Sequence, residues 1–153
     1  MQWVKFGGFE LSKADKDNIL QGKKLDDRTV NMAQSLLKRQ FPEIAGLRST
    51  LLQTKEQPKG ESDTNKLQIV HSRGDHWIVA STILATKVNV YDSVYRTVDR
   101  NTSKIIKNLF PSSASTELVR INRQTGGQDC GVFAIALSTA IPNGEDPSSI
   151  KFD

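Results

Sequence analysis

Residues 67–92 read LQIVHSRGDHWIVASTILATKVNVYD and contain three largely apolar runs, at 67–71, 76–83 and 87–92. The runs are rich in Val, Ile and other residues that favour strands, and a turn sequence, SRGD at 72–75, separates the first two. Consecutive strands with connections this short pair antiparallel. The sequence therefore predicts a three-stranded antiparallel meander.

Helical patterns lie on both sides of the meander in the sequence. Before it, Asp26 or Asp27 is a helix start signal, and apolar residues then recur every three or four positions as far as Phe41, just ahead of Pro42. After it, residues 97–110 carry a second apolar face with helical spacing. These patterns predict two helices next to the sheet.

Four further segments complete the expected elements. Residues 130–141 are apolar nearly all round, which is typical of a buried helix, and residues 117–122 form a fourth strand before it. A start signal at Ser12 predicts a short helix over about residues 13–20. Residues 53–65 have no apolar side chain and predict an exposed loop. Together the elements predict an α+β fold with a central, mostly antiparallel sheet flanked by helices.

The composition is that of one ordinary globular domain, which we expect to span residues 1–153. The excess of 21 Lys and Arg over 17 Asp and Glu is only +4 and is spread along the chain, which argues against nucleic acid binding. A single cysteine allows no internal disulfide and favours an intracellular compartment. No apolar run could cross a bilayer and no secretory leader begins at Met1, so we expect a soluble protein without a membrane partner.

The lone cysteine, Cys130, stands at the expected start of the buried helix. Unpaired backbone N–H groups and the helix dipole at such a start favour the thiolate over the thiol, which makes Cys130 a candidate nucleophile. A small buried core residue explains the position alone equally well. The residues that could act with the thiol must decide between the two explanations.

A cysteine nucleophile needs a general base, and the chain has only two histidines, His71 and His76. If residues 84–86 form the turn between the second and third strands, position 78 faces Asp92. His76 is then the diagonal neighbour of that carboxylate on the same face of the sheet. A shift of one residue would send the two side chains to opposite faces. In the chosen register His76 is the base and Asp92 orients it, whereas His71 has no carboxylate partner and is an ordinary strand residue.

Amide hydrolysis also requires hydrogen-bond donors for a developing oxyanion. Gln124 lies six residues before Cys130 and could supply a side-chain N–H beside the backbone amide of Cys130, because Gly126 and Gly127 let the loop between them bend. Taken singly, Gln124 is explained as well by a solvated loop residue, and Asp92 by a cap at the end of a strand. Their combination with the Cys and His favours thiol protease chemistry.

Three blocks, HW at 76–77, YDS at 91–93 and QTGGQDCGVF at 124–133, resemble the ubiquitin-like-protein-specific cysteine proteases, which include the SUMO proteases. That family carries a His-Trp pair on one strand, an Asp-Ser on the next, and a Gln six residues before the Cys of an Asp-Cys-Gly helix start. The resemblance implies a papain-like fold, cleavage after the C-terminal Gly-Gly of a modifier, and no metal or organic cofactor. By the same resemblance, the catalytic positions are taken by Cys130, His76, Asp92 and Gln124.

The resemblance also implies contacts with the substrate. Trp77 matches a tryptophan that covers the channel for the modifier's glycine tail, and packing in the core is a compatible explanation of the same side chain. Residues 24–27 and Asn31 resemble the head of the first substrate-facing helix, but Lys24 replaces a tryptophan and removes a second aromatic wall. Asp27 could meet a basic residue of the modifier, or serve as a helix N-cap.

The expected function is thiol-dependent hydrolysis after the Gly-Gly of SUMO or a relative, by a monomer whose partners are the modifier and its conjugates. A processing peptidase of transposon or viral type has the same chemistry and a different substrate. A catalytically silent modifier-binding domain is a further alternative. It is suggested by Lys24 and by the short polar tail after residue 141, where the family usually adds another helix.

Overall fold

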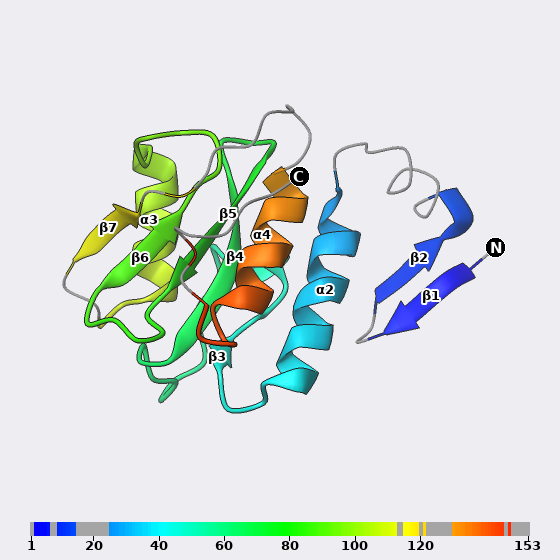
Figure 1. Ribbon diagram of the computed structural model, residues 1–153, viewed down its shortest axis with the longest axis horizontal. Coiled ribbons are helices and arrows are strands. Elements are labelled where there is room, and N and C mark those ends of the chain that lie inside the picture. The colour runs from blue at the N-terminus through cyan, green and yellow to red at the C-terminus, as the bar shows by residue number, and fades with distance from the viewer. Residues whose placement is uncertain are drawn as a thin grey trace.

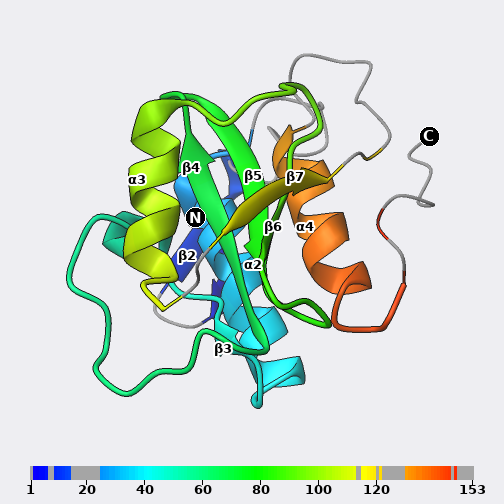
Figure 2. The same cartoon turned by 90° about the vertical axis from the view of Figure 1, so that its left-hand side faces the viewer.

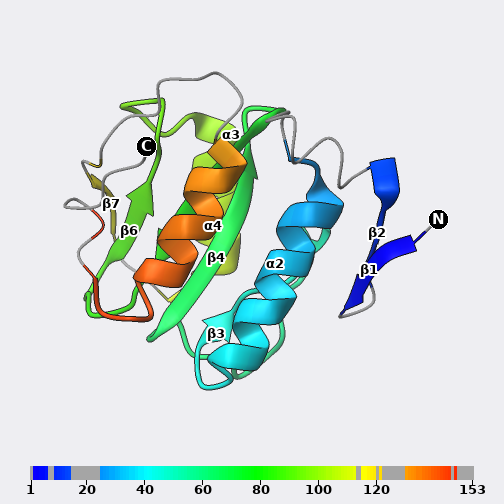
Figure 3. The same cartoon turned by 45° about the vertical axis from the view of Figure 1, so that its right-hand side comes forward.

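A five-stranded sheet forms the centre of the protein and is covered by helices on both faces (Figures 1 and 2). The computed structural model describes residues 2–6, 9–14, 25–112, 115–119, 121, 130–145 and 147. Helices α2 (Asp27–Gln40) and α4 (Cys130–Ala140) lie side by side on one face, and α3 (Arg100–Leu109) covers the other (Figure 3). This arrangement confirms the predicted α+β class.

The strands follow one another across the sheet in sequence order, from β3 to β7. They are listed here with their bounds: β3 (Ala45–Gly46), β4 (Lys66–Ser72), β5 (His76–Ser81), β6 (Val88–Tyr91) and β7 (Thr116–Val119). The pairs β4–β5 and β5–β6 are antiparallel, which confirms the predicted meander. The two outer pairs, β3–β4 and β6–β7, are parallel, so the sheet is mixed. The parallel pair β6–β7 follows from its connection through α3, since parallel neighbours need a long crossover.

The register between β5 and β6 is the predicted one. Val79 pairs with Tyr91 and Ala80 with Val90, and continuing this ladder by one step sets position 78 opposite position 92. The turn between the two strands contains Leu84 in a left-handed conformation, with φ of 54°. The side-chain period of two then assigns each strand residue to a fixed face of the sheet.

Alternation along the strands divides the core into two clusters, one on each face. Leu67, Ile69, Trp77 and Val79 point towards α2 and α4, and the same cluster contains Cys130. Residues one position along, such as Val70 and Ile78, point towards α3 on the other face. The nucleophile candidate is therefore part of the larger cluster, at 3% exposure.

Helix α2 begins where the sequence predicts. Asp26 is its N-cap, and its carboxylate accepts a hydrogen bond from the backbone N–H of Thr29 at 3.0 Å. The helix ends at Gln40, two residues before Pro42, as expected for a residue that cannot donate the next backbone bond. None of the helices formed by the described residues is long and apolar enough to cross a membrane.

The loop at 53–65 is mostly exposed, as predicted, but it is held to the domain at several points. The carboxylate of Glu61 lies 3.3 Å from the buried Lys66 Nζ and also binds Arg48. Asn108 of α3 donates to the backbone carbonyls of Gln53 and Lys55, both at 2.9 Å. Side chains outside this polar loop, namely Arg48, Lys66 and Asn108, therefore hold it in place. The composition of the loop alone does not reveal these contacts.

The N-terminal part differs from the prediction. Strands β1 (Gln2–Phe6) and β2 (Phe9–Ser12) form an antiparallel hairpin that the sequence analysis did not anticipate. Two short apolar runs around a Gly-Gly pair are the hairpin signal that was available. Of the helix expected at 13–20, residues 13 and 14 are helical, and the rest lies outside the described residues.

Candidate active site

The imidazole of His76 and the carboxylate of Asp92 form a buried pair at one end of the sheet. His76 is the first residue of β5, and Asp92 follows the last residue of β6. Their Nε2 and Oδ1 atoms lie 2.7 Å apart, and the two side chains are only 6% and 5% exposed. The diagonal relation predicted from the register therefore brings these side chains into direct contact.

The carboxylate of Asp92 is fixed by its own backbone as well. Its Oδ1 accepts hydrogen bonds from the N–H groups of Val94 at 2.8 Å and Tyr95 at 2.9 Å. The sequence offered two alternative roles for Asp92, a cap at the end of a strand and the partner of the histidine. In the structure Asp92 makes the contacts of both roles. A carboxylate held in this way can orient the imidazole without moving itself.

Cys130 is the first residue of α4 and lies within hydrogen-bond reach of His76. Burial, the strongest influence, raises the pKa of the Cys130 thiol. Hydrogen bonds from His76 and from the backbone of Trp77, together with the charge of the imidazole, outweigh burial and hold the pKa below its ordinary value of 9.0. These groups favour the thiolate, which is the nucleophilic form.

His76 shows the opposite shift. Burial is again the strongest influence and lowers the pKa, but hydrogen bonds to Asp92 and Cys130 outweigh it and raise the pKa of His76 to about 9. At neutral pH the imidazole is then protonated, and its Nε2–H donates to Asp92 Oδ1. The chain Asp92–His76–Cys130 can therefore hold a carboxylate, an imidazolium and a thiolate in a row.

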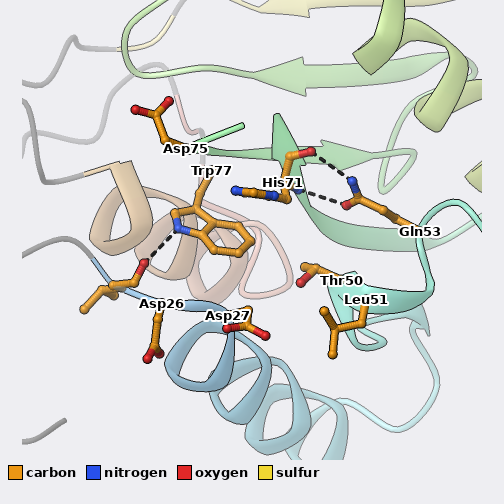
Figure 4. A pocket seen from close by; sticks show the side chains of 9 residues that line it. Asp26, Asp27, Thr50, Leu51, Gln53, His71, Asp75 and Trp77 are labelled. Atoms are coloured by element: carbon orange, nitrogen blue, oxygen red, sulfur yellow. Dashed lines mark hydrogen bonds between the residues drawn. The ribbon is translucent and has the colours of Figure 1, made fainter. Parts of the chain in front are cut away.

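Trp77 follows His76 in β5 and lines a pocket of about 340 Å³ (Figure 4). Its Nε1 donates to the carbonyl oxygen of Leu25 at 3.1 Å, and its ring packs against that of His71 with centroids 4.5 Å apart. The pocket is lined by Leu25, Asp26, Asp27, Thr50, Leu51, Gln53, His71, Asp75 and Trp77. The core packing and the channel position proposed for Trp77 are thus compatible in this fold.

The two carboxylates at the start of α2 have different roles. Asp26 serves as the N-cap and also pairs with Arg28 at 3.1 Å. Asp27 is the first helical residue and lines the pocket (Figure 4). Within the described part of the chain it has no hydrogen-bond or ion-pair partner. The helix cap therefore does not account for Asp27.

Buried polar groups hold the opposite wall of the pocket. The 3-10 turn η1 (Thr50–Leu52) is attached to α2 by Asn31, which is 1% exposed. The Asn31 amide donates to Thr50 Oγ1 at 3.1 Å and its Oδ1 accepts from the Thr50 N–H at 2.9 Å. Leu51 is left at 64% exposure on the rim.

The remaining predicted positions give a mixed result. Gln124 and Lys24 lie outside the described residues. His71 is a strand residue whose backbone exchanges hydrogen bonds of 2.9 Å with the side chain of Gln53, and no carboxylate in the described part of the chain binds its ring. The sequence analysis missed Tyr95, whose ring contacts His76. In the ranges that the structure describes, no three His, Cys, Asp or Glu side chains form a group that could hold a metal ion.

Comparison with known proteins gives matches by structure. No family model matches the chain, and no curated protein matches its sequence. The fold is similar to the C-terminal Ulp1 protease domain in complex with Smt3, the yeast ortholog of SUMO, with a TM-score of 0.77 and 13% identity over 96% of this chain and 78% of that one. SUMO protease Ulp1 with its catalytic cysteine oxidised to a sulfenic acid gives a TM-score of 0.73 and 10% identity over 99% and 80%.

A structure described as the de-sumoylating protease is also similar, with a TM-score of 0.65 and 13% identity over 90% of this chain and 70% of that one. At such identities the likeness shows the fold. It confirms the papain-like α+β fold that the resemblance implied.

Proposed function

We propose that the chain is a cysteine peptidase that hydrolyses the peptide or isopeptide bond after the C-terminal Gly-Gly of a ubiquitin-like modifier, SUMO or a relative. The observation that carries the proposal is the buried chain of contacts from Asp92 through His76 to Cys130. Likeness to SUMO protease structures over nearly the whole chain supports the class of substrate. The three blocks that resemble this protease family support it independently of the fold.

In the proposed reaction the Cys130 thiolate attacks the carbonyl carbon of the terminal glycine, and the carbonyl oxygen becomes an oxyanion. The backbone N–H of Cys130 and the side chain of Gln124 are the proposed donors to that oxygen. The imidazolium of His76 protonates the leaving amine as the C–N bond breaks, which leaves a thioester on Cys130. His76 then takes a proton from water, and the hydroxide attacks the thioester carbonyl and displaces the Cys130 thiolate, so that the modifier leaves with a free carboxyl group and the thiolate–imidazolium pair is restored.

Trp77 and Asp27 are the proposed substrate contacts. A glycine tail has no side chains, so it fits a narrow passage beside a large aromatic ring that larger residues could not enter. Asp27 lines the neighbouring pocket, its carboxylate has no partner among the residues that the structure describes, and it suits a basic group of the modifier. These two contacts would select a Gly-Gly end that belongs to a folded, partly basic protein.

The decisive experiment uses a panel of ubiquitin-like modifiers with C-terminal vinyl sulfones, incubated with the chain and with Cys130→Ala, and scored by intact mass. An adduct on the parent and none on the variant is expected, and the panel identifies the modifier. A folded parent that forms no adduct with any modifier contradicts the proposal. Binding without an adduct would then indicate a silent modifier-binding domain, and cleavage of other glycine-containing peptides would indicate a processing peptidase.

A further inference from the structure

Two loops at the His76 end of the sheet are joined by an arginine. The turn between β4 and β5 contains Arg73, and the segment that follows β6 contains Tyr95 and Thr97. The guanidinium of Arg73 lies over the Tyr95 ring, 3.9 Å from its centroid. Its Nη2 also donates to the carbonyl oxygen of Thr97 at 2.9 Å. A planar cation with both contacts holds the Tyr95 ring in one orientation.

The ring held by Arg73 packs against the imidazole of His76. The two ring centroids are 5.1 Å apart and the planes are nearly perpendicular, at 78°. The backbone N–H of the same Tyr95 donates to Asp92 Oδ1. Tyr95 therefore contacts both members of the His76–Asp92 pair, one through its ring and the other through its backbone.

The hydrogen bond to Asp92 would not by itself stop the His76 imidazole from tilting about that bond. Asp92 fixes the position of Nε2, but the direction of the other ring nitrogen, which must face the Cys130 thiol, depends on what packs against the ring. An edge-to-face aromatic contact stabilises by about 0.5–1.5 kcal/mol and has a preferred geometry. Such a contact is strong enough to select one ring orientation.

We propose that Tyr95, held by Arg73, is a positioning residue that keeps the His76 imidazole aligned with both Asp92 and Cys130. The consequence for turnover rests on the proposed peptidase function, whereas the alignment of His76 with Cys130 does not. Tyr95 is 39% exposed, and in the described part of the chain its hydroxyl has no hydrogen-bond partner. The ring, rather than the hydroxyl, therefore carries the role.

The backbone at Arg73 supports the same inference. Arg73 has a φ of 54°, in the left-handed region that residues other than glycine seldom adopt. Such a conformation costs on the order of 1 kcal/mol and persists only where other contacts offset it. The hairpin turn between β4 and β5, in which Gly74 also has a positive φ of 83°, sets this conformation, and the Arg73 side chain then lies against Tyr95 and Thr97.

The test measures the rate at which iodoacetamide alkylates Cys130 as a function of pH. The thiolate displaces iodide from this small reagent, so the measurement reports the alignment of His76 with Cys130 without any modifier. Tyr95→Ala removes the ring, and Tyr95→Leu keeps apolar bulk without it. Tyr95→Phe keeps the ring, Arg73→Lys keeps the charge but loses the planar group, and Arg96→Ala removes an exposed arginine of the same loop.

We expect Tyr95→Ala, Tyr95→Leu and Arg73→Lys to move the alkylation midpoint upwards by about half a pH unit to one unit, because a misaligned imidazolium stabilises the thiolate less. Tyr95→Phe and Arg96→Ala should match the parent. With a cleavable modifier, Tyr95→Leu should lower kcat about tenfold and leave KM within about twofold.

The proposal is overturned if Tyr95→Leu folds and keeps the parent midpoint, or if Tyr95→Phe shifts as far as Tyr95→Leu, since the latter would assign the effect to the hydroxyl. A shifted midpoint in a protein that labels with no modifier supports the positioning role while the proposed function fails. Circular dichroism melts of each variant separate these outcomes from unfolding.

Discussion

At the scale of single residues, Asp92 is the side chain whose two roles can be separated by one substitution. Asp92→Asn leaves an oxygen that can accept from the N–H groups of Val94 and Tyr95, so the turn should persist. The charge that helps to raise the pKa of His76 to about 9 is lost, and that pKa should fall towards 6.5. We expect kcat/KM to drop by about 10²–10⁴-fold.

The pH profile of Asp92→Asn should show in which direction the pKa of His76 moves. In the parent, activity should rise as Cys130 ionises and fall as His76 loses its proton near pH 9. In Asp92→Asn the alkaline limb should move to lower pH. Glu145→Gln, a change at an exposed carboxylate after α4, should leave the profile intact. An alkaline limb that stays near pH 9 in Asp92→Asn would show that Asp92 does not act on His76.

The adjacent carboxylates Asp26 and Asp27 provide a matched pair. Asp26→Ala removes the N-cap bond to Thr29 and should reduce the unfolding free energy by about 1 kcal/mol. Asp27→Ala removes the favourable interaction of a carboxylate with the helix dipole, about 0.3–1 kcal/mol. Both carboxylates line the pocket, but that of Asp26 is bound by Thr29 and Arg28, whereas that of Asp27 has no partner among the described residues. Asp27→Ala should therefore raise KM severalfold for a basic modifier and leave kcat unchanged. Equal KM values for the two variants would exclude Asp27 as a substrate contact.

At the scale of elements, the meander could be predicted because each link in its argument is local. The apolar runs locate the strands, the turn at 84–86 sets the register, and the period of two then places His76 and Asp92 on one face. The parallel edge strands depend on long crossovers, which no local pattern reports.

The contact of Tyr95 with His76 was equally beyond reach of the sequence. It depends on the conformation of two turns and on the left-handed backbone of Arg73. Neither Arg nor Tyr is a residue that signals such a turn, since left-handed positions normally favour glycine or asparagine. The sequence therefore predicted the group that could react and missed the contacts that hold it.

The start of α4 supports a prediction of its own, because Gly131 packs directly against Leu25. A Cβ added at Gly131 would lie 3.0 Å from the Leu25 Cβ, closer than side chains normally approach. Gly131→Ala should therefore push the helix start, and Cys130 with it, by a few tenths of an ångström. We expect a fall in kcat of about tenfold with a loss of stability of about 1 kcal/mol.

Gly60→Ala is the matched control for Gly131→Ala. Gly60 has a φ of 81°, but nothing lies within 4 Å of an added Cβ. Its substitution should cost about 1 kcal/mol through backbone conformation alone, far from the thiol in sequence and on an exposed loop. Urea unfolding and initial rates should therefore show similar stability losses and different rates. A similar fall in kcat for both variants would attribute the effect to stability.

At the scale of the whole molecule, the thiol–imidazole pair is tied to folding through protons. In the unfolded chain His76 has its ordinary pKa of 6.5 and Cys130 its ordinary pKa of 9.0, so between these values the one proton sits on sulfur. In the folded chain the lowered thiol pKa and the raised imidazole pKa move that proton to nitrogen. At a pH above the lowered thiol pKa and between the ordinary and the raised imidazole pKa, both states then bind the same number of protons. In that range this pair adds no pH dependence to stability.

Replacing the thiol should reveal how the titration of His76 makes stability depend on pH, an effect that the titration of Cys130 balances in the parent. In Cys130→Ser only the imidazole titrates, and Asp92 still raises its pKa, so above pH 6.5 the folded chain binds one proton that the unfolded chain lacks. The stabilisation is complete below pH 6.5 and is lost as pH rises through the raised pKa, with a slope of at most about 1.4 kcal/mol per pH unit. Urea unfolding at several pH values from 6.5 to 8.5 should show Cys130→Ser losing stability relative to the parent, and Cys130→Ser/His76→Gln should not. Parallel curves for the parent and Cys130→Ser would mean that Asp92 without the thiolate does not raise the pKa of His76 above its ordinary value.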